Sequence, residues 1–179
     1  ERTLSPRYLK ELQLGKNLAL VSDSGTPLLS DPGYHLTSLA AANGIRISPI
    51  PGPSASLAAL TVSGFEVERF CFEGFLPQKS GRRRKALEEV LARECASVIY
   101  ESPHRIVKLC EELEGLQPDR EISIARELTK LHEEVLRGTA REVTAELRAR
   151  KAIKGEFVLV VRRAPRRRAG DTEEGENES

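Results

Sequence analysis

Two periods of hydrophobic residues alternate along the chain, and each change of period predicts a new helix or strand. Apolar residues at helical spacing, with proline or N-cap residues before them and in several cases glycine after them, predict helices at residues 5–15, 31–44, 55–62, 82–93, 105–113 and 141–150. Short apolar or alternating runs predict strands at residues 17–21, 45–50, 70–75, 97–100, 121–125, 132–137 and 157–161. The pattern therefore predicts repeated βαβ units.

Repeated βαβ alternation is typical of the α/β class. Helices in such folds cover both faces of a sheet, and we expect parallel strand pairs in at least the first half of the chain. Residues 63–69 are the candidate junction, so we predict an N-terminal α/β domain at 1–64 and a C-terminal α/β domain at 65–162. Arginines followed by acidic residues make 163–179 a charged tail, which we expect to be disordered.

Composition narrows the class of protein further. A hydrophobic content of 39% suffices for a core. The sequence has no apolar run of about 18 residues and no signal-like start, which predicts a soluble, cytoplasmic protein without a membrane partner. A net charge of +1 leaves a nucleic-acid partner open, so any basic surface must be local. The chain contains no methionine, from which we expect a fragment that lacks the front of its reading frame.

The cysteines predict a reducing compartment. Cys71, Cys95 and Cys110 are far apart, lie beside apolar residues, and form neither a CxxC pair nor an even set. Their sequence context favours three small buried side chains. The three histidines share no ligand spacing with them, so we expect no metal site.

Two polar loops follow the first two predicted strands. One contains Gly25, Thr26 and Pro27, and the other is the stiff Pro51-Gly52-Pro53 segment. Ligands in open α/β sheets bind beyond the carboxyl ends of strands, where backbone amides converge. Either loop alone is better explained as an ordinary turn, but two in adjacent units favour a binding site. Neither has the GxGxxG or P-loop pattern, so a dinucleotide or nucleoside triphosphate has no motif support.

These loops resemble those of the tetrapyrrole-methylase-like superfamily. Residues 21–33 and 49–55 carry this resemblance. Similarity to the superfamily's ribosomal RNA branch is found at residues 72–77, 100–105, 125–130 and 154–160. The resemblance spans roughly residues 9–161. Agreement of several motifs in the same order is highly specific for the superfamily. Members begin with a strand and a loop of the Thr-Pro-Ile-Gly-Asn-Leu type, which we expect ahead of Glu1. We expect the charged tail to stand in place of a short helical extension that is common at their C-terminus.

The resemblance implies two α/β/α domains of the tetrapyrrole-methylase type with S-adenosylmethionine bound in the cleft between them. It implies a homodimer, and 2′-O-methylation of a cytidine in small-subunit ribosomal RNA. The implied donor-binding residues are the two loops and one aromatic residue: Ser22, Asp23, Gly25, Thr26, Pro27, Pro51, Gly52, Pro53, Ser54, Ala55 and Tyr100. Tyr100 is equally well explained as core packing.

Methyl transfer to a ribose hydroxyl requires alignment and the loss of a proton, which polar residues after strands can assist. The candidate catalytic residues are Glu101, His104, Arg105, Arg126 and Glu127. Two alternatives remain open: Ser102-Pro103 can be a plain helix start, and Arg126 with Glu127 a surface ion pair.

A basic cluster opens the helix predicted at 82–93. It comprises Lys79, Arg82, Arg83, Arg84 and Lys85, and Lys130 is a further candidate elsewhere. Positive charges at a helix N-terminus oppose its dipole, so helix stability does not explain them. We expect an RNA-backbone contact, with a solvated helix face as the alternative.

Other functions stay open at this stage. Within the superfamily, the alternatives are methylation of a corrin or porphyrin precursor and diphthine synthesis on elongation factor 2. From other classes, they are a non-catalytic RNA-binding module and a sugar-phosphate or nucleotide enzyme that uses the same loops to bind phosphate.

Overall fold

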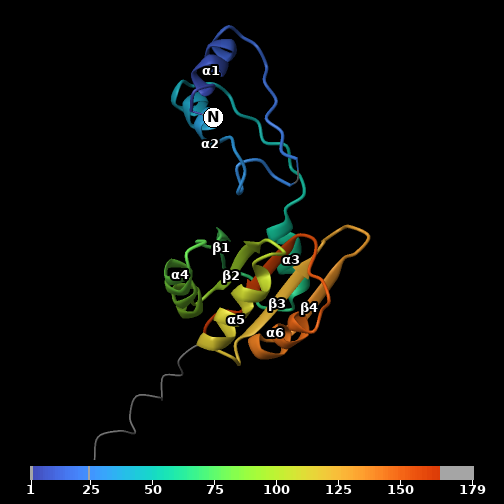
Figure 1. Cartoon of the computed structure of the whole chain (residues 1–179). Helices are drawn as coiled ribbons and strands as arrows, with labels where there is room; N and C mark the ends of the chain where they lie inside the picture. The colour runs from blue at the N-terminus through green and yellow to red at the C-terminus, as the bar shows by residue number, and fades with distance from the viewer. Residues whose placement is uncertain (1, 24, 166–179) are drawn as a thin grey trace, which may run out of the picture. The chain divides into compact units, whose positions relative to one another are not determined.

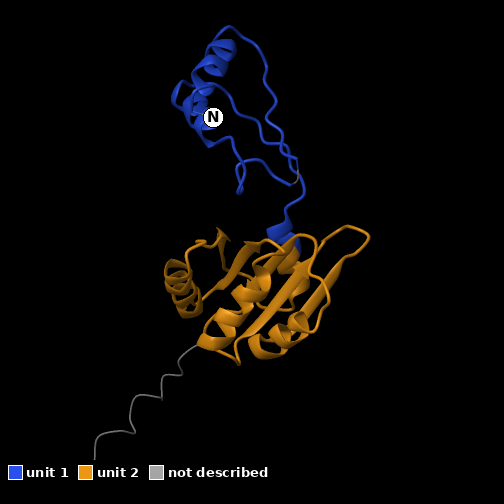
Figure 2. Cartoon of the chain, in the orientation of Figure 1, with its two compact units in different colours: residues 1–58 blue, residues 59–179 orange. Residues whose placement is uncertain are grey.

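The structure is a computed structural model that describes residues 2–23 and 25–165. The chain divides into two compact units, residues 1–58 and residues 59–179 (Figure 2). The predicted disordered tail lies outside the described residues from position 166 onward.

Unit 1 contains two helices joined by extended segments (Figure 1). They are α1 (Ser5–Gln13) and α2 (Tyr34–Ala42), and α3 (Ala55–Ser63) begins in this unit. Side-chain hydrogen bonds tie the two helices together, from Gln13 Nε2 to Asn43 Oδ1 at 3.5 Å and from Arg2 Nε to His35 Nε2 at 3.1 Å. The predicted helices at 5–15 and 31–44 are therefore present with shorter bounds.

The strands predicted at 17–21 and 45–50 are wrong, because both segments are irregular in the structure. Their apolar side chains are largely exposed, Val21 to 82% and Ile50 to 86%. An apolar run becomes a strand only when a neighbour supplies ladder hydrogen bonds. Within the described part of unit 1, neither segment has such a neighbour.

The start of α2 also differs from the prediction, in which Asp31 is the N-cap of the helix at 31–44 and Pro32 is its first residue. The pair Asp31-Pro32 does not cap this helix, whose N-cap is Gly33. The reason is visible in the side chain of Asp31, which accepts a hydrogen bond from Ser22 Oγ at 2.7 Å. That carboxylate therefore holds the preceding loop instead of the helix terminus.

Unit 2 is built on a five-stranded mixed sheet of order β1-β2-β5-β3-β4. The strands are β1 (Phe70–Phe75), β2 (Ala96–Glu101), β3 (Glu121–Arg126), β4 (Glu134–Thr139) and β5 (Phe157–Val161). Among these strands only β1 and β2 pair in parallel, and the other three pairs are antiparallel. Each strand predicted in this region is confirmed within two residues at either end.

Helices cover both faces of this sheet, as the alternation predicted (Figure 1). One face packs against α4 (Ser80–Ala92), α5 (Ile106–Leu116) and α6 (Ala140–Arg148), and the other against α3. All five residues of β5 are buried, because this strand is central and covered on both sides. None of the described helices is long and apolar enough to cross a membrane.

Candidate functional site

The two polar loops of unit 1 adjoin each other in the structure. Thr26 Oγ1 donates a hydrogen bond to the carbonyl oxygen of Pro53 at 3.0 Å. A Cβ added to Gly25 would lie 3.8 Å from that same oxygen. Segments 27 residues apart in sequence therefore lie next to each other.

The two adjoining loops offer backbone groups of the kind that the implied donor, S-adenosylmethionine, would contact. The loop residues are exposed or half-buried, so their amide and carbonyl groups are available to a zwitterionic amino-acid group. Gly25, Leu28 and Ser30 have positive φ values of 74°, 73° and 66°. Non-glycine residues in this conformation are strained and concentrate at ligand sites. These loops therefore fit the donor that the resemblance implies.

In unit 2, the polar residues predicted after β2 and β3 meet at one edge of the sheet. Glu101 and Arg126 are both register partners of Phe157, one on each side of β5. Two strand spacings separate their Cα atoms by about 10 Å. β2 and β3 are each antiparallel to β5, so they point the same way and end at this edge. We call it the carboxyl edge of the sheet.

Glu101 binds Arg105, which links the turn after β2 to the segment after β1. Its side chain is fully buried, forms an ion pair with Arg105 at 3.1 Å and accepts a hydrogen bond from the amide of Ser102 at 2.7 Å. Arg105 in turn donates to the carbonyl oxygen of Leu76 at 2.9 Å. Glu101 and Arg105 therefore position the carboxyl edge, whereas His104 between them is exposed.

The Ser102-Pro103 pair does not cap α5 with its side chain. The N-cap of α5 is Arg105. The carbonyl oxygen of Ser102 accepts hydrogen bonds from the amides of Arg105 and Ile106, at 3.1 and 3.0 Å. A turn after β2 thus separates Glu101 from the helix.

Arg126 and Glu127 do not pair as the surface ion-pair alternative supposed. Arg126 Nε donates to the carbonyl oxygen of Lys154 at 2.6 Å, and its Nη1 lies 3.5 Å from a carboxylate oxygen of Glu134. Glu127 instead accepts a hydrogen bond from the amide of Glu156 at 2.8 Å. Both side chains therefore hydrogen-bond to the backbone immediately before β5.

Glu127 is held by close packing as well as by hydrogen bonds. Its φ is 48°, and a Cβ added to Gly155 would lie 2.6 Å from its Cγ. The Glu156 amide, followed by the Lys130 ammonium, lowers the pKa of the Glu127 carboxyl. Lys130 Nζ lies 3.2 Å from Glu127 and 3.0 Å from Glu156, and the resulting hydrogen bonds raise its pKa.

Tyr100 lies on the sheet face opposite Glu101, because strand side chains alternate. It packs edge-on against Phe72 and Phe75, with ring centroids 5.0 and 5.9 Å apart. Phe75 is the register partner of Tyr100 and is 56% exposed. These three rings form a partly open apolar surface at the carboxyl edge.

The basic cluster at the start of α4 divides into buried and exposed members. Arg83 is 4% exposed, and its guanidinium donates to Glu112 at 2.5 and 2.7 Å and to the Gln78 carbonyl at 3.0 Å. Hydrogen bonding to Arg83 lowers the pKa of Glu112. Arg83 therefore joins α4 to α5 and is not part of an RNA-binding surface. The exposed members are Lys79, Arg82, Arg84 and Lys85.

Comparison with known proteins shows the family. The sequence profile of the Tetrapyrrole (Corrin/Porphyrin) Methylases matches residues 1–144. This chain belongs to the tetrapyrrole methylases. It is 47% identical to "Ribosomal RNA small subunit methyltransferase I" of Coprothermobacter proteolyticus over 155 residues, which are 87% of this chain and 68% of that protein.

Other relatives of the same name are longer than this chain. The protein of Halalkalibacterium halodurans is 44% identical over 90% of this chain and 55% of its own length, and that of Xylella fastidiosa is 44% identical over 98% and 65%. The chain thus spans about half to two thirds of the curated relatives it matches first.

Solved structures confirm the tetrapyrrole methylase fold. The methyltransferase CobJ superposes with a TM-score of 0.66 at 24% identity, covering 95% of this chain and 74% of CobJ. A diphthine synthase gives a TM-score of 0.61 at 13% identity, covering 90% and 67%. The predicted fold class is therefore confirmed.

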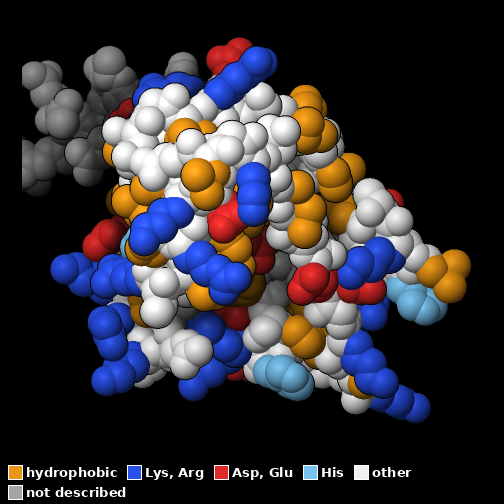
Figure 3. All heavy atoms as spheres, turned by 90° about the horizontal axis from the view of Figure 1, so that it is seen from above, with side chains coloured by type: hydrophobic (Ala, Val, Ile, Leu, Met, Phe, Trp, Pro, Cys, Tyr) orange, Lys and Arg blue, Asp and Glu red, His pale blue; other side chains and the backbone are white. Residues whose placement is uncertain are grey.

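Sequence reasoning missed the partners that fix the predicted residues in place. Glu112 and Glu134 hold Arg83 and Arg126, and Arg150 binds Glu134 through two contacts of 2.7 Å. These partners are 8 to 29 residues away along the chain, so local spacing gives no signal for them. Lys and Arg side chains, with fewer Asp and Glu side chains among them, are spread over the face seen in Figure 3.

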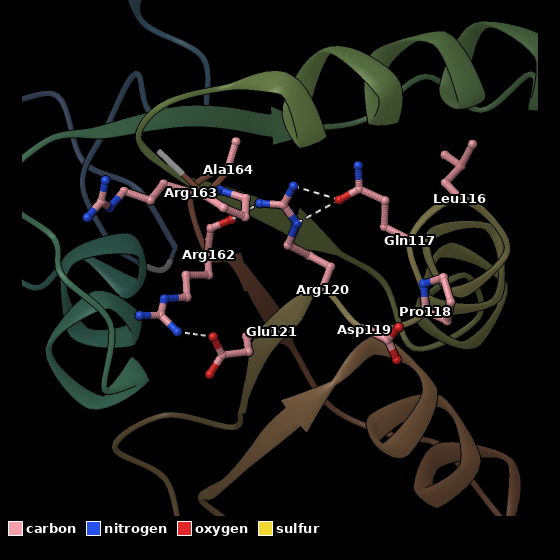
Figure 4. Close-up of a pocket in the computed structure, with 10 residues that line it drawn as sticks. Leu116, Gln117, Pro118, Asp119, Arg120, Glu121, Arg162, Arg163 and Ala164 are labelled. Carbon is pink, nitrogen blue, oxygen red and sulfur yellow. Dashed lines mark hydrogen bonds and ion pairs between the residues drawn. The ribbon is translucent and has the colours of Figure 1, made fainter. Parts of the chain in front are cut away.

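A cavity of about 600 Å³ in unit 2 lies at the sheet edge opposite the carboxyl edge (Figure 4). It is lined by the end of α5, the turn before β3, the start of β3 and residues 162–165, which follow β5. Arg120 donates to Gln117 and to the carbonyl oxygens of Leu91 and Arg162, while the Arg162 side chain pairs with Glu121. Because these cations are already engaged, we assign no ligand to this cavity. Among the residues described, no group of three His, Cys, Asp or Glu side chains could hold a metal ion.

Proposed function

We propose that the protein containing this chain is an S-adenosylmethionine-dependent methyltransferase that modifies the 2′-hydroxyl of a cytidine in small-subunit (16S) ribosomal RNA. The close relatives named ribosomal RNA small subunit methyltransferase I support this substrate class. The observation that carries the proposal is the hydrogen bond from Thr26 to Pro53, because it joins the two implied donor-binding loops.

The donor would be held by backbone groups of Ser22, Asp23, residues 25–27 and residues 51–55. A neighbour in the same fold, a uroporphyrin-III C-methyl transferase from Thermus thermophilus, was solved with S-adenyl homocysteine, at a TM-score of 0.55 and 15% identity. When bound, the sulfonium group supplies an activated methyl carbon. Tyr100, which the family resemblance also implies as a donor-binding residue, packs against Phe72 and Phe75 within unit 2.

The residues of the carboxyl edge would orient the ribose and accept its proton. Glu101 and Arg105 bind each other and the backbone, so they position the edge rather than react. His104 is exposed beside them and is the candidate proton acceptor. Glu127 has a lowered pKa and stays ionised near neutral pH, so together with Arg126 it keeps the entry to β5 fixed.

The exposed residues Lys79, Arg82, Arg84 and Lys85 would contact the RNA backbone. They lie at the start of α4, which follows the end of β1, and β1 is parallel to β2. The start of α4 therefore lies at the carboxyl edge as well. As further parts of the proposal, the whole protein is a cytoplasmic homodimer, because its substrate is ribosomal RNA and the family resemblance implies two copies.

The test of the donor site is calorimetry with S-adenosylmethionine on the full-length protein. Thr26→Val removes the hydroxyl that joins the loops, which costs about 1 kcal/mol and should weaken donor binding about fivefold. The matched control is Thr37→Val, which removes a hydroxyl donating to the Gly33 carbonyl within α2 and touches neither loop. Equal affinities for the two variants would contradict the proposed site.

The test of the substrate is mass mapping of 16S ribosomal RNA from cells that lack the full-length gene. We expect the loss of one ribose methyl group, restored by the wild-type gene. Retention of every ribose methyl, with donor binding intact, would instead favour a different acceptor such as a corrin precursor.

A further inference from the structure

Two cysteines that are far apart in the sequence lie close together at the edge of the sheet opposite the carboxyl edge. The Sγ atoms of Cys71 and Cys95 are 2.9 Å apart, although 24 residues separate them along the chain. Cys71 is the second residue of β1, and Cys95 immediately precedes β2. The separation of the sulfur atoms exceeds a disulfide bond length of about 2.0 Å by less than about 1 Å.

The strand register explains why these two thiols face each other. Cys71 is the register partner of Ser97, and side chains two residues apart on a strand share a face. Cys95 therefore projects on the same side of the sheet as Ser97 and lies diagonally opposite Cys71. β1 and β2 are hydrogen-bonded to each other, so the sheet holds this juxtaposition in place.

We propose that Cys71 and Cys95 are a reversible dithiol that low-molecular-weight disulfides oxidise. In the first step one thiolate attacks the small disulfide, forms a mixed disulfide and releases one small thiolate. In the second step the other protein thiolate attacks the mixed bond, which forms the Cys71–Cys95 disulfide and releases the second small thiolate. Two electrons pass from the protein to the small disulfide, and the two thiol protons go to the released thiolates or to solvent.

The surroundings of the pair suit thiol exchange. Both side chains are half-buried, so a small disulfide can reach them. Arg93 lies beside them and is fixed by an ion pair with Glu73 at 2.8 Å, and its charge favours thiolate formation. Burial and contact with Cys71 nevertheless raise the pKa of Cys95, so exchange should be faster in mildly alkaline buffer.

The third cysteine provides an internal comparison. Cys110 lies in α5, is completely buried, and has a pKa that burial raises to about 12. It should remain a thiol while the pair oxidises. The pair lies at the edge opposite Glu101, so oxidation should leave S-adenosylmethionine binding by the full-length protein unchanged.

The experiment treats the folded chain with excess oxidised glutathione in mildly alkaline buffer and then counts thiols after denaturation. We expect the thiol count to fall from three to one, with a mass loss of about 2 Da in the monomer and full recovery with dithiothreitol. Peptide mapping without reduction should show a single cross-linked pair containing Cys71 and Cys95. Cys110→Ser should behave like the wild type, whereas Cys71→Ser should lose the cross-link.

Three results would overturn the proposal. They are retention of all three thiols, stable glutathione adducts without an internal cross-link, and a cross-link that includes Cys110 or a second chain. Because peptide mapping is done on the unmodified sequence, the test holds even if a serine variant fails to fold.

Discussion

Truncation of Arg83 should destabilise unit 2, although this residue belongs to a basic cluster that looks solvent-facing in sequence. In Arg83→Ala the Glu112 carboxylate loses both of its guanidinium contacts and the Gln78 carbonyl loses a donor. The side chain of Glu112 is only 22% exposed, so water replaces these contacts incompletely. We expect a loss of about 3 kcal/mol in the free energy of unfolding.

Hydrogen exchange of the β2 and α5 amides measures this loss within unit 2 itself. Arg84→Ala is the matched control, because Arg84 is the next residue and its ion pair with Glu88 has side chains 63% and 52% exposed. That control should change stability by less than about 0.5 kcal/mol. A double variant, Arg83→Met with Glu112→Leu, should recover most of the stability, since no unpaired charge is left.

The stability difference between wild type and Arg83→Ala should also depend on pH. Arg83 lowers the pKa of Glu112 in the folded chain, so its stabilising contribution is complete above the unfolded glutamate pKa of about 4.3 and is lost as pH falls through the lower folded value. The hydrogen bond to Glu112 also raises the pKa of Arg83, but that contribution is lost only as the pH rises through the guanidinium range, which lies above the working range. Equal losses in the Arg83 and Arg84 variants, or a difference that persists undiminished in strong acid, would refute the assignment of Arg83 to the core.

Three further predictions concern the exposed cations, a helix cap and the entry to β5. Reversing Arg82 and Lys85 to Glu should weaken binding of the full-length protein to small ribosomal subunits and reduce its salt dependence, measured by filter binding at several salt concentrations; unchanged affinity would remove these residues from the RNA surface. Thr139→Ala should lower the stability of unit 2 by about 1 kcal/mol in thermal unfolding, because it removes the capping box of α6, and Thr139→Ser should retain it. Gly155→Ala should displace Glu127 and lower the methylation rate of the full-length protein, while donor affinity falls less. Wild-type kinetics would exclude a role for this packing in catalysis.

Local sequence patterns predicted most of unit 2 and little of unit 1. The bounds of β1 and β5 were predicted to the residue, because each is a short apolar run that pairs with β2 in the sheet, although only β5 is buried along its whole length. The same kind of run at 17–21 stays irregular, because alternation specifies which face is apolar but not whether a neighbouring strand exists. The start of α2 was misplaced for a related reason, since Asp31 binds Ser22 rather than a helix amide.

The sequence by itself determined the α/β class, the family and the two loops proposed for the donor, because these depend on periodicity and on residues close together in the chain. Only the tertiary structure decided that Thr26 reaches Pro53, that Arg83 is buried against Glu112, and that Cys71 meets Cys95. Each of these contacts joins residues more than 20 positions apart. Such partners are selected by the way elements pack, and local spacing carries no signal for them.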